Sequence, residues 1–396
     1  MLKQVEGSKA VADAVAACQP EVICAYPISP QTHIVEGLSA LVKDGTLPNC
    51  EFINVESEFA AMSVAIGSSA TGARTYTATA SQGLLYMVEA VYNASGLGLP
   101  IVMTVANRAI GGPINIWNDH SDSMSQRDSG WLQLYAENNQ EAVDLHIQAF
   151  RIAEEMSMPV MVCMDGFILT HAYEQVDIPT TEEVKAFLPP FVPRQHLDPA
   201  DPVSIGAMVG PESFMEVKYL AHQRMIDSLE KVQQVADDFE AHFGRKTGGL
   251  LRSYRTDGAE TIVLALGSII GTLKDVIDEL QLDGKSIGVV GLTSFRPFPY
   301  EAVAAALKGA KRVIILEKAF STGTGGIVTQ DVARAIEGRG ITDFTVIAGL
   351  GGRPITIASL RNYLTNAMAE NIERLTFLDL EIDTVEVEIN KERALR

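Results

Sequence analysis

The chain has 396 residues, of which 47% are hydrophobic, and its 50 acidic side chains outnumber 31 Lys and Arg to give a net charge of −19. This length suffices for two or three domains with buried cores, while the negative charge argues against binding to nucleic acid or to an anionic membrane surface. No uncharged run reaches transmembrane length, and the segment from Met1 to Glu6 lacks the apolar core of a signal peptide, so a cytoplasmic location is expected.

Strands and helices alternate over the first 180 residues. Apolar runs predict strands at 22–26, 75–79, 101–106 and 160–165, and helical periodicity predicts helices at 7–17, 58–69, 84–95 and 141–155. This alternation is typical of an α/β domain with a doubly wound parallel sheet, covered by helices on both faces.

A long surface connection is predicted at 186–213, where six prolines exclude a continuous helix or a central strand. A charged helix is expected to follow at 216–243. Its intermittent apolar stripe, which includes Val232 and Phe239, favours a helix that braces two domains over one that binds a partner.

The alternation restarts after residue 260. Strands are predicted at 261–266, 286–292, 312–317 and 344–348, and helices at 271–280, 300–307 and 328–337. These elements predict a second, smaller α/β domain with its own parallel sheet. The segment 381–387 alternates apolar and acidic residues like an edge strand or a docking arm. The expected division is 1–245, 246–366 and a tail at 367–396.

The cysteines and the familiar catalytic motifs narrow the chemistry by what they lack. Cys18, Cys24, Cys50 and Cys163 are scattered without a C-x-x-C pair, so this chain by itself is not expected to ligate an iron–sulfur cluster or a structural zinc. An electron relay is therefore expected on another chain. The loop 321–326 follows a strand and precedes a helix, where it could cradle an anion, but a tight structural turn is the favoured interpretation.

Three polar side chains are expected at one edge of the first sheet. Ser29 lies in the loop 26–32 behind a predicted strand, Glu58 begins an Ala-rich helix, and Arg108 follows the strand at 101–106. The carboxyl ends of parallel strands meet at one edge, where Arg108 can clamp a carboxylate with the Ser29 hydroxyl as a further donor. The alternatives are a surface ion pair for Arg108 and a first-turn helix acid for Glu58.

The run 119–122, Asp-His-Ser-Asp, contains residue types that bind metals. One histidine with flanking carboxylates lacks the spacing of a known metal site, so no metal is expected here. The favoured interpretation is a loop that packs near a cofactor or a neighbouring subunit, with Trp117 and Trp131 as anchors.

Several of these segments, taken in order, resemble one family. They are Tyr26-Pro27-Ile28-Ser29-Pro30, the helix start at Glu58, and the segments 79–84, 107–109, 115–122, 164–167, 295–299, 316–319 and 349–353. Together they resemble the alpha subunit of the multi-subunit pyruvate:ferredoxin oxidoreductase (pyruvate synthase) family over essentially the whole chain.

The resemblance implies a pyrimidine-binding domain for thiamine diphosphate, followed by a transketolase C-terminal-like domain. It implies that Glu58 hydrogen-bonds the aminopyrimidine ring and that Arg108 lies near the substrate carboxylate, both as catalytic residues. Tyr26 and Ser29 are then expected at the substrate, and Pro27 and Ile28 at the cofactor. Ser29 stands where the family usually has threonine, which keeps the hydroxyl donor but loses a methyl group.

The family also implies partners and a reaction. Thiamine diphosphate is shared with a beta subunit that holds the diphosphate and Mg²⁺, a delta subunit carries [4Fe-4S] clusters, and a gamma subunit completes the complex. The expected reaction converts pyruvate and coenzyme A reversibly to acetyl-CoA and carbon dioxide, with electrons passed to an external ferredoxin or flavodoxin. The alternatives are the same chemistry on 2-oxoglutarate, a branched-chain 2-oxoacid or oxalate, and a non-catalytic assembly subunit.

Overall fold

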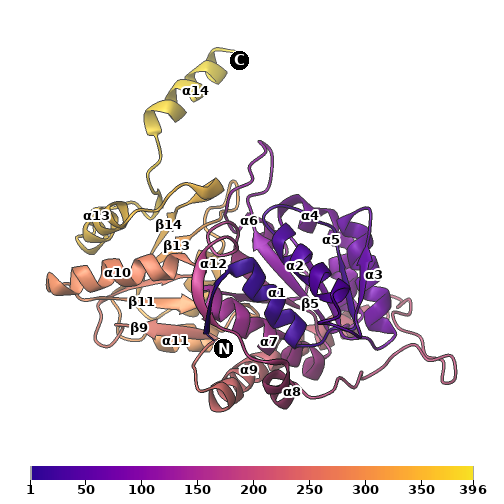
Figure 1. Cartoon of the computed structure of the whole chain (residues 1–396). Coiled ribbons are helices and arrows are strands. Elements are labelled where there is room, and N and C mark those ends of the chain that lie inside the picture. Colours follow the sequence, from indigo (N-terminus) through magenta and orange to yellow (C-terminus); the bar gives the residue numbers. More distant parts are fainter. Residues whose placement is uncertain (1, 396) are drawn as a thin grey trace.

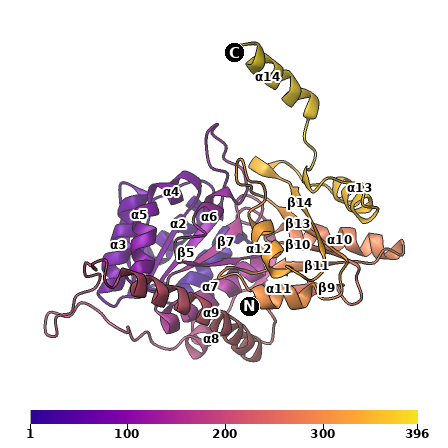
Figure 2. The same ribbon diagram turned by 180° about the vertical axis from the view of Figure 1, so that it is seen from behind.

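A computed structural model describes residues 2–395 and shows two α/β units side by side, one built mainly from the first half of the chain and one from the second (Figure 1). The view from behind shows the same two units with helix α9 (Phe214–Phe243) lying against the first of them (Figure 2). Both units have a mostly parallel sheet between helices, so the predicted α/β class is confirmed.

The first unit is built around a seven-stranded sheet in the order β12-β6-β7-β5-β4-β2-β3. Its strands are β2 (Val22–Ala25), β3 (Glu51–Asn54), β4 (Thr75–Thr79), β5 (Ile101–Asn107), β6 (Leu132–Tyr135), β7 (Val160–Asp165) and β12 (Ser294–Arg296). Six of them are parallel, and β12 pairs with β6 in the antiparallel direction. Because β12 comes from the second half of the chain, that half supplies the edge strand of the first sheet.

Between residue 2 and α9 the structure has eight helices. They are α1 (Gly7–Ala17), α2 (Thr32–Lys43), α3 (Glu58–Ala70), α4 (Ser81–Tyr86), α5 (Val88–Gly96), α6 (Ser121–Ser125), α7 (Asn139–Met156) and α8 (Thr181–Phe187). The helix predicted at 84–95 is in fact two helices, because Met87 leaves helical geometry with φ −93° and ψ 9°. Two further strands, β1 (Leu2–Glu6) and β8 (Tyr173–Asp177), pair in the antiparallel direction as a separate two-stranded sheet.

The second unit contains a six-stranded sheet in the order β15-β14-β13-β10-β11-β9. Its strands are β9 (Leu251–Tyr254), β10 (Thr261–Ala265), β11 (Ile287–Leu292), β13 (Arg312–Glu317), β14 (Thr342–Ile347) and β15 (Leu375–Phe377). Its helices are α10 (Ile269–Leu282), α11 (Tyr300–Ala306), α12 (Val328–Ala335), the 3₁₀ turn η1 (Leu350–Gly352) and α13 (Ile357–Met368). Buried aliphatic side chains from β10, β11 and β13 form the core between these layers.

The end of the chain differs from the expectation. The boundary expected at residue 366 falls inside α13, and β15 still pairs with β14, so the second sheet extends to Phe377. The edge strand expected at 381–387 is wrong, since this segment lies in helix α14 (Ile382–Ala394). Figure 1 shows α14 standing away from both units at the end of an extended segment, and none of its residues is buried.

The long helix α9 packs on the first unit, and its role as a brace between two domains stays a prediction. The first half of α9 is exposed, but Val232, Val235 and Phe239 in its second half are buried in the core of the first unit. The proline-rich segment before it forms neither helix nor strand between residues 188 and 213 and runs over the surface. Among residues 2–395, no helix is both long enough and apolar enough to cross a bilayer.

Candidate functional site at the carboxyl edge of the first sheet

Five parallel strands, β3, β2, β4, β5 and β7, end at the same edge of the first sheet. Strand pairing places Asn54 beside Ala25 at the end of β2, and Asp165 beside Asn107 at the end of β5. The segments that leave this edge carry the residues expected from the sequence. The edge therefore brings together parts of the chain that lie up to about 140 residues apart.

Arg108 follows β5 directly and is buried, with 7% of its surface exposed. Its Nη1 donates to the backbone carbonyl of Ser29 at 3.0 Å, and its Nε donates to the carbonyl of Asn115 at 3.1 Å. Burial lowers the pKa of this guanidinium, while the charge of Asp122 opposes that shift. Within residues 2–395, Arg108 forms no ion pair with a carboxylate, so the alternative of a surface ion pair is wrong.

The Arg108 guanidinium is hydrogen-bonded only to neutral carbonyls among residues 2–395, and the charge of Asp122 acts on it without a direct ion pair. Nη2 makes no hydrogen bond to residues 2–395 and Nη1 keeps a second N–H, so the end of the planar fork can donate two parallel bonds to a carboxylate. The geometry therefore fits an anion-binding role for Arg108.

The loop that contains Ser29 meets Arg108, although not in the expected way. The contact uses the carbonyl of Ser29, and its exposed hydroxyl forms no hydrogen bond to any residue between 2 and 395. Tyr26 and Pro27 are exposed in the same loop, and the N–H of Ile28 donates to Gln31 Oε1 at 3.2 Å. Ser29 and Tyr26 are thus open to a ligand, while Ile28 is partly covered.

Glu58 lies elsewhere on this edge, at the start of α3. The Ser57 hydroxyl caps this helix by accepting from the N–H of Ala60 at 3.2 Å, so Glu58 is not the cap. The Glu58 side chain is only 8% exposed and forms no hydrogen bond or ion pair with the rest of the described chain. It packs against Gly83, where an added Cβ would lie 2.8 Å from Glu58 Oε1.

Next to Glu58, the hydroxyl of Thr79 is buried and finds no hydrogen-bond partner among the described residues. Two polar side chains therefore lie side by side without partners among residues 2–395, in a cradle that only glycine at position 83 leaves open. The Thr79 hydroxyl is fully buried, while 8% of Glu58 remains exposed. Unpaired buried polar groups are costly, and each one in a folded protein calls for an explanation such as a ligand. The surroundings of Glu58 fit a hydrogen-bonding ligand.

Asp122 links the loops of this edge. Its Oδ2 accepts from the N–H groups of Ser81 at 2.9 Å and Arg108 at 3.0 Å, and its Oδ1 accepts from Asn107 Nδ2 at 2.8 Å and the N–H of Ser123 at 2.7 Å. Burial raises the pKa of the Asp122 carboxyl to about 6, although these four donors favour its ionised form. Asp122 thus holds the segment after β4 against the segment after β5.

The other polar residues of the run 119–122 point to different places. Asp119 accepts from the N–H of Ser121 at 2.9 Å and from the N–H of Gly351 at 3.1 Å. His120 Nε2 lies 2.6 Å from Asp165 Oδ1 in the buried contact between the two units. The run therefore does not converge on one point, and it packs against the second unit of the same chain.

Asp165 is the centre of that contact. Its Oδ2 pairs with Lys318 Nζ at 3.0 Å and accepts from the N–H of Ser268 at 3.1 Å. Burial alone would raise the pKa of Asp165, but the charge of Lys318 and the contact with His120 outweigh it and hold this pKa well below its usual range. Lys318 also donates to Asn118 Oδ1, so this ammonium spans both units.

The two tryptophans that were expected as anchors differ in burial. Trp131 is fully buried and donates from Nε1 to the carbonyl of Val91 at 2.8 Å, so it anchors the first unit. Trp117 is half exposed and stacks on Phe167, with ring centroids 4.9 Å apart. Of these two tryptophans, Trp131 is the one that is buried as an anchor in the part of the chain that the structure describes.

The loop 321–326 is a structural turn, as expected. The carboxylate of Glu317 fills the start of α12, where it accepts from the N–H groups of Ile327 and Val328, both at 2.7 Å. An anion site at this helix start is therefore already occupied by the protein itself. The four cysteines are all buried, and burial raises the pKa of Cys24 to about 11, so its thiol is not activated.

Sequence reasoning missed three residues that shape the site. Gln31 is fully buried and donates from Nε2 to the carbonyl of Ala78 at 2.7 Å, which ties the Ser29 loop to β4. Gly83 and Asp122 lie in motifs that the sequence singled out, but their roles depend on contacts across the fold. A glycine next to a strand end was the one available signal, since it marks a close approach.

Two families match the chain. The family described as "Pyruvate flavodoxin/ferredoxin oxidoreductase, thiamine diP-bdg" matches residues 13–237, and "Pyruvate:ferredoxin oxidoreductase core domain II" matches residues 259–360. The chain is 50% identical over 363 residues to the pyruvate synthase subunit PorA of Methanosarcina barkeri, covering 90% of each chain. It is 37% identical over 376 residues to the ketoisovalerate oxidoreductase subunit VorA of Pyrococcus abyssi, covering 94% of each chain.

A solved structure has the same fold. The 2-oxoglutarate:ferredoxin oxidoreductase from Magnetococcus marinus, with 2-oxoglutarate, coenzyme A and succinyl-CoA bound, superposes with a TM-score of 0.68 at 18% identity. The match covers 92% of this chain, which spans 65% of the length of that neighbour. At this identity the likeness concerns the fold alone.

Proposed function

The chain belongs to the pyruvate flavodoxin/ferredoxin oxidoreductase family, and we propose that it is the alpha subunit of a pyruvate synthase. In this role it takes part in the oxidative decarboxylation of pyruvate to acetyl-CoA and carbon dioxide, with the electrons passed to ferredoxin. The enzyme is thus a thiamine-diphosphate-dependent 2-oxoacid:ferredoxin oxidoreductase that works only with partner subunits. We propose that the reaction is reversible and that the enzyme is cytoplasmic.

The buried guanidinium of Arg108 supports pyruvate as the substrate. Arg108 offers one two-point contact, which suits a monocarboxylate, and the loop beside it carries Ser29 and not a second Arg for a dianion such as 2-oxoglutarate. The identity to a pyruvate synthase subunit, at 50%, also exceeds that to a ketoisovalerate oxidoreductase subunit, at 37%. Tyr26 and Ser29 are proposed to complete the substrate side of the site.

The cradle around Glu58 supports the cofactor role. Thiamine diphosphate, when bound, supplies the nucleophilic carbon that attacks the 2-oxo carbon of the substrate. Glu58 is proposed to exchange a proton with the aminopyrimidine ring, because its carboxyl group is buried without another partner. Thr79 offers an unpaired hydroxyl beside this carboxyl group, and Gly83 leaves room for the ring. Pro27 and Ile28 are proposed to line the same pocket.

Partner subunits are proposed to supply the rest of the site. Exposed aromatic rings lie on the helices around this edge. Phe59 follows Glu58 on α3, the Tyr86 ring of α4 has its centroid 6.4 Å from that of Phe59, and Tyr92 lies on α5. Exposed aromatic side chains are enriched at protein interfaces, so this surface is proposed to receive the beta subunit with the diphosphate and Mg²⁺. The delta subunit with [4Fe-4S] clusters, the gamma subunit and ferredoxin or flavodoxin complete the proposed assembly, with coenzyme A as cosubstrate.

The units of the chain are proposed to divide this work. The two family matches fall on either side of residue 245, which supports a pyrimidine-binding unit at 1–245 and a transketolase C-terminal-like unit after it. Helix α14 is proposed as a docking arm, because none of its residues is buried and it carries Ile382, Val385 and Ile389 on one face.

The observation that carries the proposal is the buried, unpaired carboxyl group of Glu58, and Glu58→Gln in the assembled complex tests it. Glutamine keeps the size but cannot exchange the proton, so turnover should fall by roughly 10²- to 10⁴-fold while the thiamine diphosphate content stays near that of the wild type. The matched control is Glu56→Gln, which alters an exposed carboxylate two residues earlier. Near-normal turnover in Glu58→Gln would return this residue to a structural role at the helix start.

A further inference from the structure

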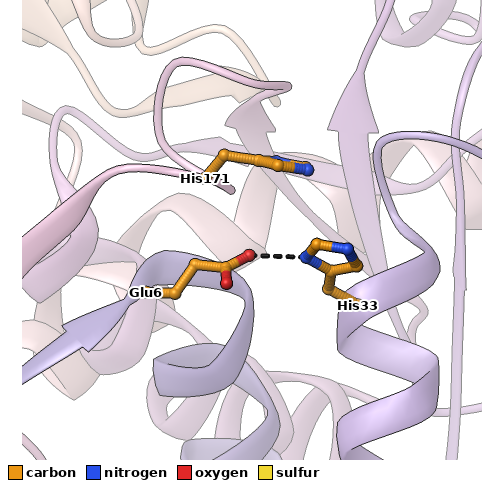
Figure 3. A group of neighbouring side chains, drawn as sticks. All are labelled: Glu6, His33 and His171. Atoms are coloured by element: carbon orange, nitrogen blue, oxygen red, sulfur yellow. Dashed lines mark hydrogen bonds and ion pairs between the residues drawn. The ribbon is translucent and has the colours of Figure 1, made fainter.

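A second group of polar side chains lies outside the candidate site. Glu6 at the end of β1, His33 in the first turn of α2 and His171 in the segment before β8 offer three possible metal-ligand atoms that all lie within 4.8 Å of one another. Figure 3 shows the His171 ring above the Glu6 carboxylate and the His33 ring, with one bond joining Glu6 and His33. We call these three residues the Glu6 cluster.

The contacts within the Glu6 cluster resemble an open ligand set. His33 Nδ1 lies 2.6 Å from Glu6 Oε1, and the His33 and His171 rings have centroids 4.7 Å apart. His171 Nδ1 also lies 2.8 Å from the Thr170 hydroxyl, at hydrogen-bond distance. This contact leaves Nε2 of His171 as its available ligand atom. A ligand histidine is commonly oriented in this way by a hydrogen bond to its other ring nitrogen.

We propose that Glu6, His33 and His171 bind one divalent transition-metal ion of the zinc class. Two imidazoles and one carboxylate form a ligand set that suits zinc, copper, iron or nickel, and three protein ligands leave a fourth position for water. The cluster is accessible, since half of the His33 side chain and a fifth of the Glu6 side chain are exposed. A small movement of Glu6 from His33 opens the space that the ion takes between them.

The proposed ion joins three parts of the first unit. Glu6 pairs with Tyr173 across the β1 and β8 sheet, and α2 begins directly after the loop that contains Ser29. The rings of His171, Phe167 and Trp117 continue the stack toward the candidate site, with centroids 4.8 and 4.9 Å apart. The bound ion would therefore hold α2 and the Ser29 loop in place. It is distinct from the Mg²⁺ proposed on a partner subunit.

Isothermal titration of the full chain with ZnCl₂, after removal of metal with a chelator, tests the proposal. One zinc ion per chain should bind in a tight phase, and His33→Ala and His171→Ala should each abolish that phase. The matched control is His222→Ala, which removes an exposed imidazole from α9 and should leave the phase unchanged. The cysteines do not compete for zinc in the folded chain, because all four are buried.

Two further variants separate ligation from folding. Glu6→Gln keeps the size of a partly exposed side chain and should weaken zinc binding even if an alanine variant fails to fold. Thr170→Val removes the hydroxyl that orients His171 and should weaken zinc binding by roughly 10- to 100-fold. A wild-type chain without a tight phase, or a tight phase that survives both Glu6→Gln and Thr170→Val, would overturn the proposal.

Discussion

Replacing Lys318 by methionine should destabilise the contact between the two units by about 3–5 kcal/mol, because removal of one partner from a buried ion pair leaves the Asp165 carboxylate without its ammonium partner. Lys318 and Asp165 are 3.0 Å apart, with side-chain exposures of 4% and 1%. Methionine keeps the length of the lysine stem, so the change removes the charge with little change of volume.

The expected shift of the melting temperature follows from the size of the chain. An unfolding entropy of about 2.1 cal/mol/K per residue gives roughly 0.8 kcal/mol/K for 396 residues, so a loss of about 3–5 kcal/mol corresponds to a fall of roughly 4–6 °C if both units melt together. If the units melt separately, the fall is larger, because less of the chain contributes to the entropy.

Thermal unfolding followed by circular dichroism measures this shift. The matched control is Lys311→Met, which breaks an exposed ion pair with Glu260, where the side chains are 64% and 50% exposed. This control should leave the melting temperature almost unchanged, since exposed ion pairs contribute little. A fall for Lys318→Met no larger than for Lys311→Met would refute the reasoning.

The effect should also depend on pH. The pKa of Asp165 is held well below its usual range. Burial would raise this pKa, but Lys318 and His120 lower it by more. A carboxyl group with a lowered folded-state pKa contributes stability above its unfolded pKa of about 3.9, and this stability is lost as the pH falls through the folded-state value. The difference between wild type and Lys318→Met should therefore be full at pH 7 and shrink below about pH 4.

Three other predictions concern the site and the tail. In the assembled enzyme, Arg108→Lys should lower kcat/KM for pyruvate by roughly 10- to 100-fold, because an ammonium cannot reproduce the planar two-point contact. Ser29→Ala should reduce the binding free energy of pyruvate by only about 0.5–1.5 kcal/mol. Kinetics with the reverse ranking would remove this pair from the substrate site. Gly83→Ala should lower turnover, since its Cβ would lie 2.5 Å from Thr79 Oγ1. The control Gly67→Ala in α3, with no atom within 4 Å of its Cβ, should leave turnover unchanged. Equal activity of the two variants would contradict the cradle around Glu58. Deletion of 380–396 should leave the melting temperature unchanged, because α14 has no buried residue, but should reduce the recovery of partner subunits in a pull-down; full recovery would remove α14 as a docking arm.

The sequence predicted most of the elements that have a strong periodic pattern. The helix at 7–17 and the strand at 160–165 agree with α1 and β7 at every residue. The strands β6 and β12 were missed because they have only four and three residues and are stabilised by pairing with each other across the units. Short strands of this kind depend on distant partners and leave little local signal.

The tail shows how one pattern can fit two periods. Val385, Val387 and Ile389 alternate with acidic residues, which is typical of a strand, but Ile382, Val385 and Ile389 also follow a helical spacing. The helix is favoured by the strong helix formers near its end and by Lys391 and Arg393 in its last turn, where basic side chains interact well with the helix dipole.

The site was predictable where sheet geometry determines it. Arg108 and the Ser29 loop were expected together because parallel strands place their carboxyl ends at one edge, and the structure brings them to 3.0 Å. The use of the Ser29 carbonyl in place of its hydroxyl depends on the loop conformation, which local sequence does not determine. The Glu6 cluster was not predictable, since Glu6, His33 and His171 are brought together only by the fold.

The second unit also determines how Arg108 is held. The carbonyl of Asn115 accepts from Arg108 Nε, and Asn115 Nδ2 donates to the carbonyl of Gly351 at 3.1 Å. Asn118, three residues later, accepts from Lys318 and donates to the carbonyl of Asn107, which precedes Arg108. Two residues of the second unit therefore fix both ends of the segment that orients this guanidinium. Because these contacts join the units through the loop after β5, a change in how the units pack should alter the proposed substrate contact of Arg108 more than the surroundings of Glu58, which lies outside this network.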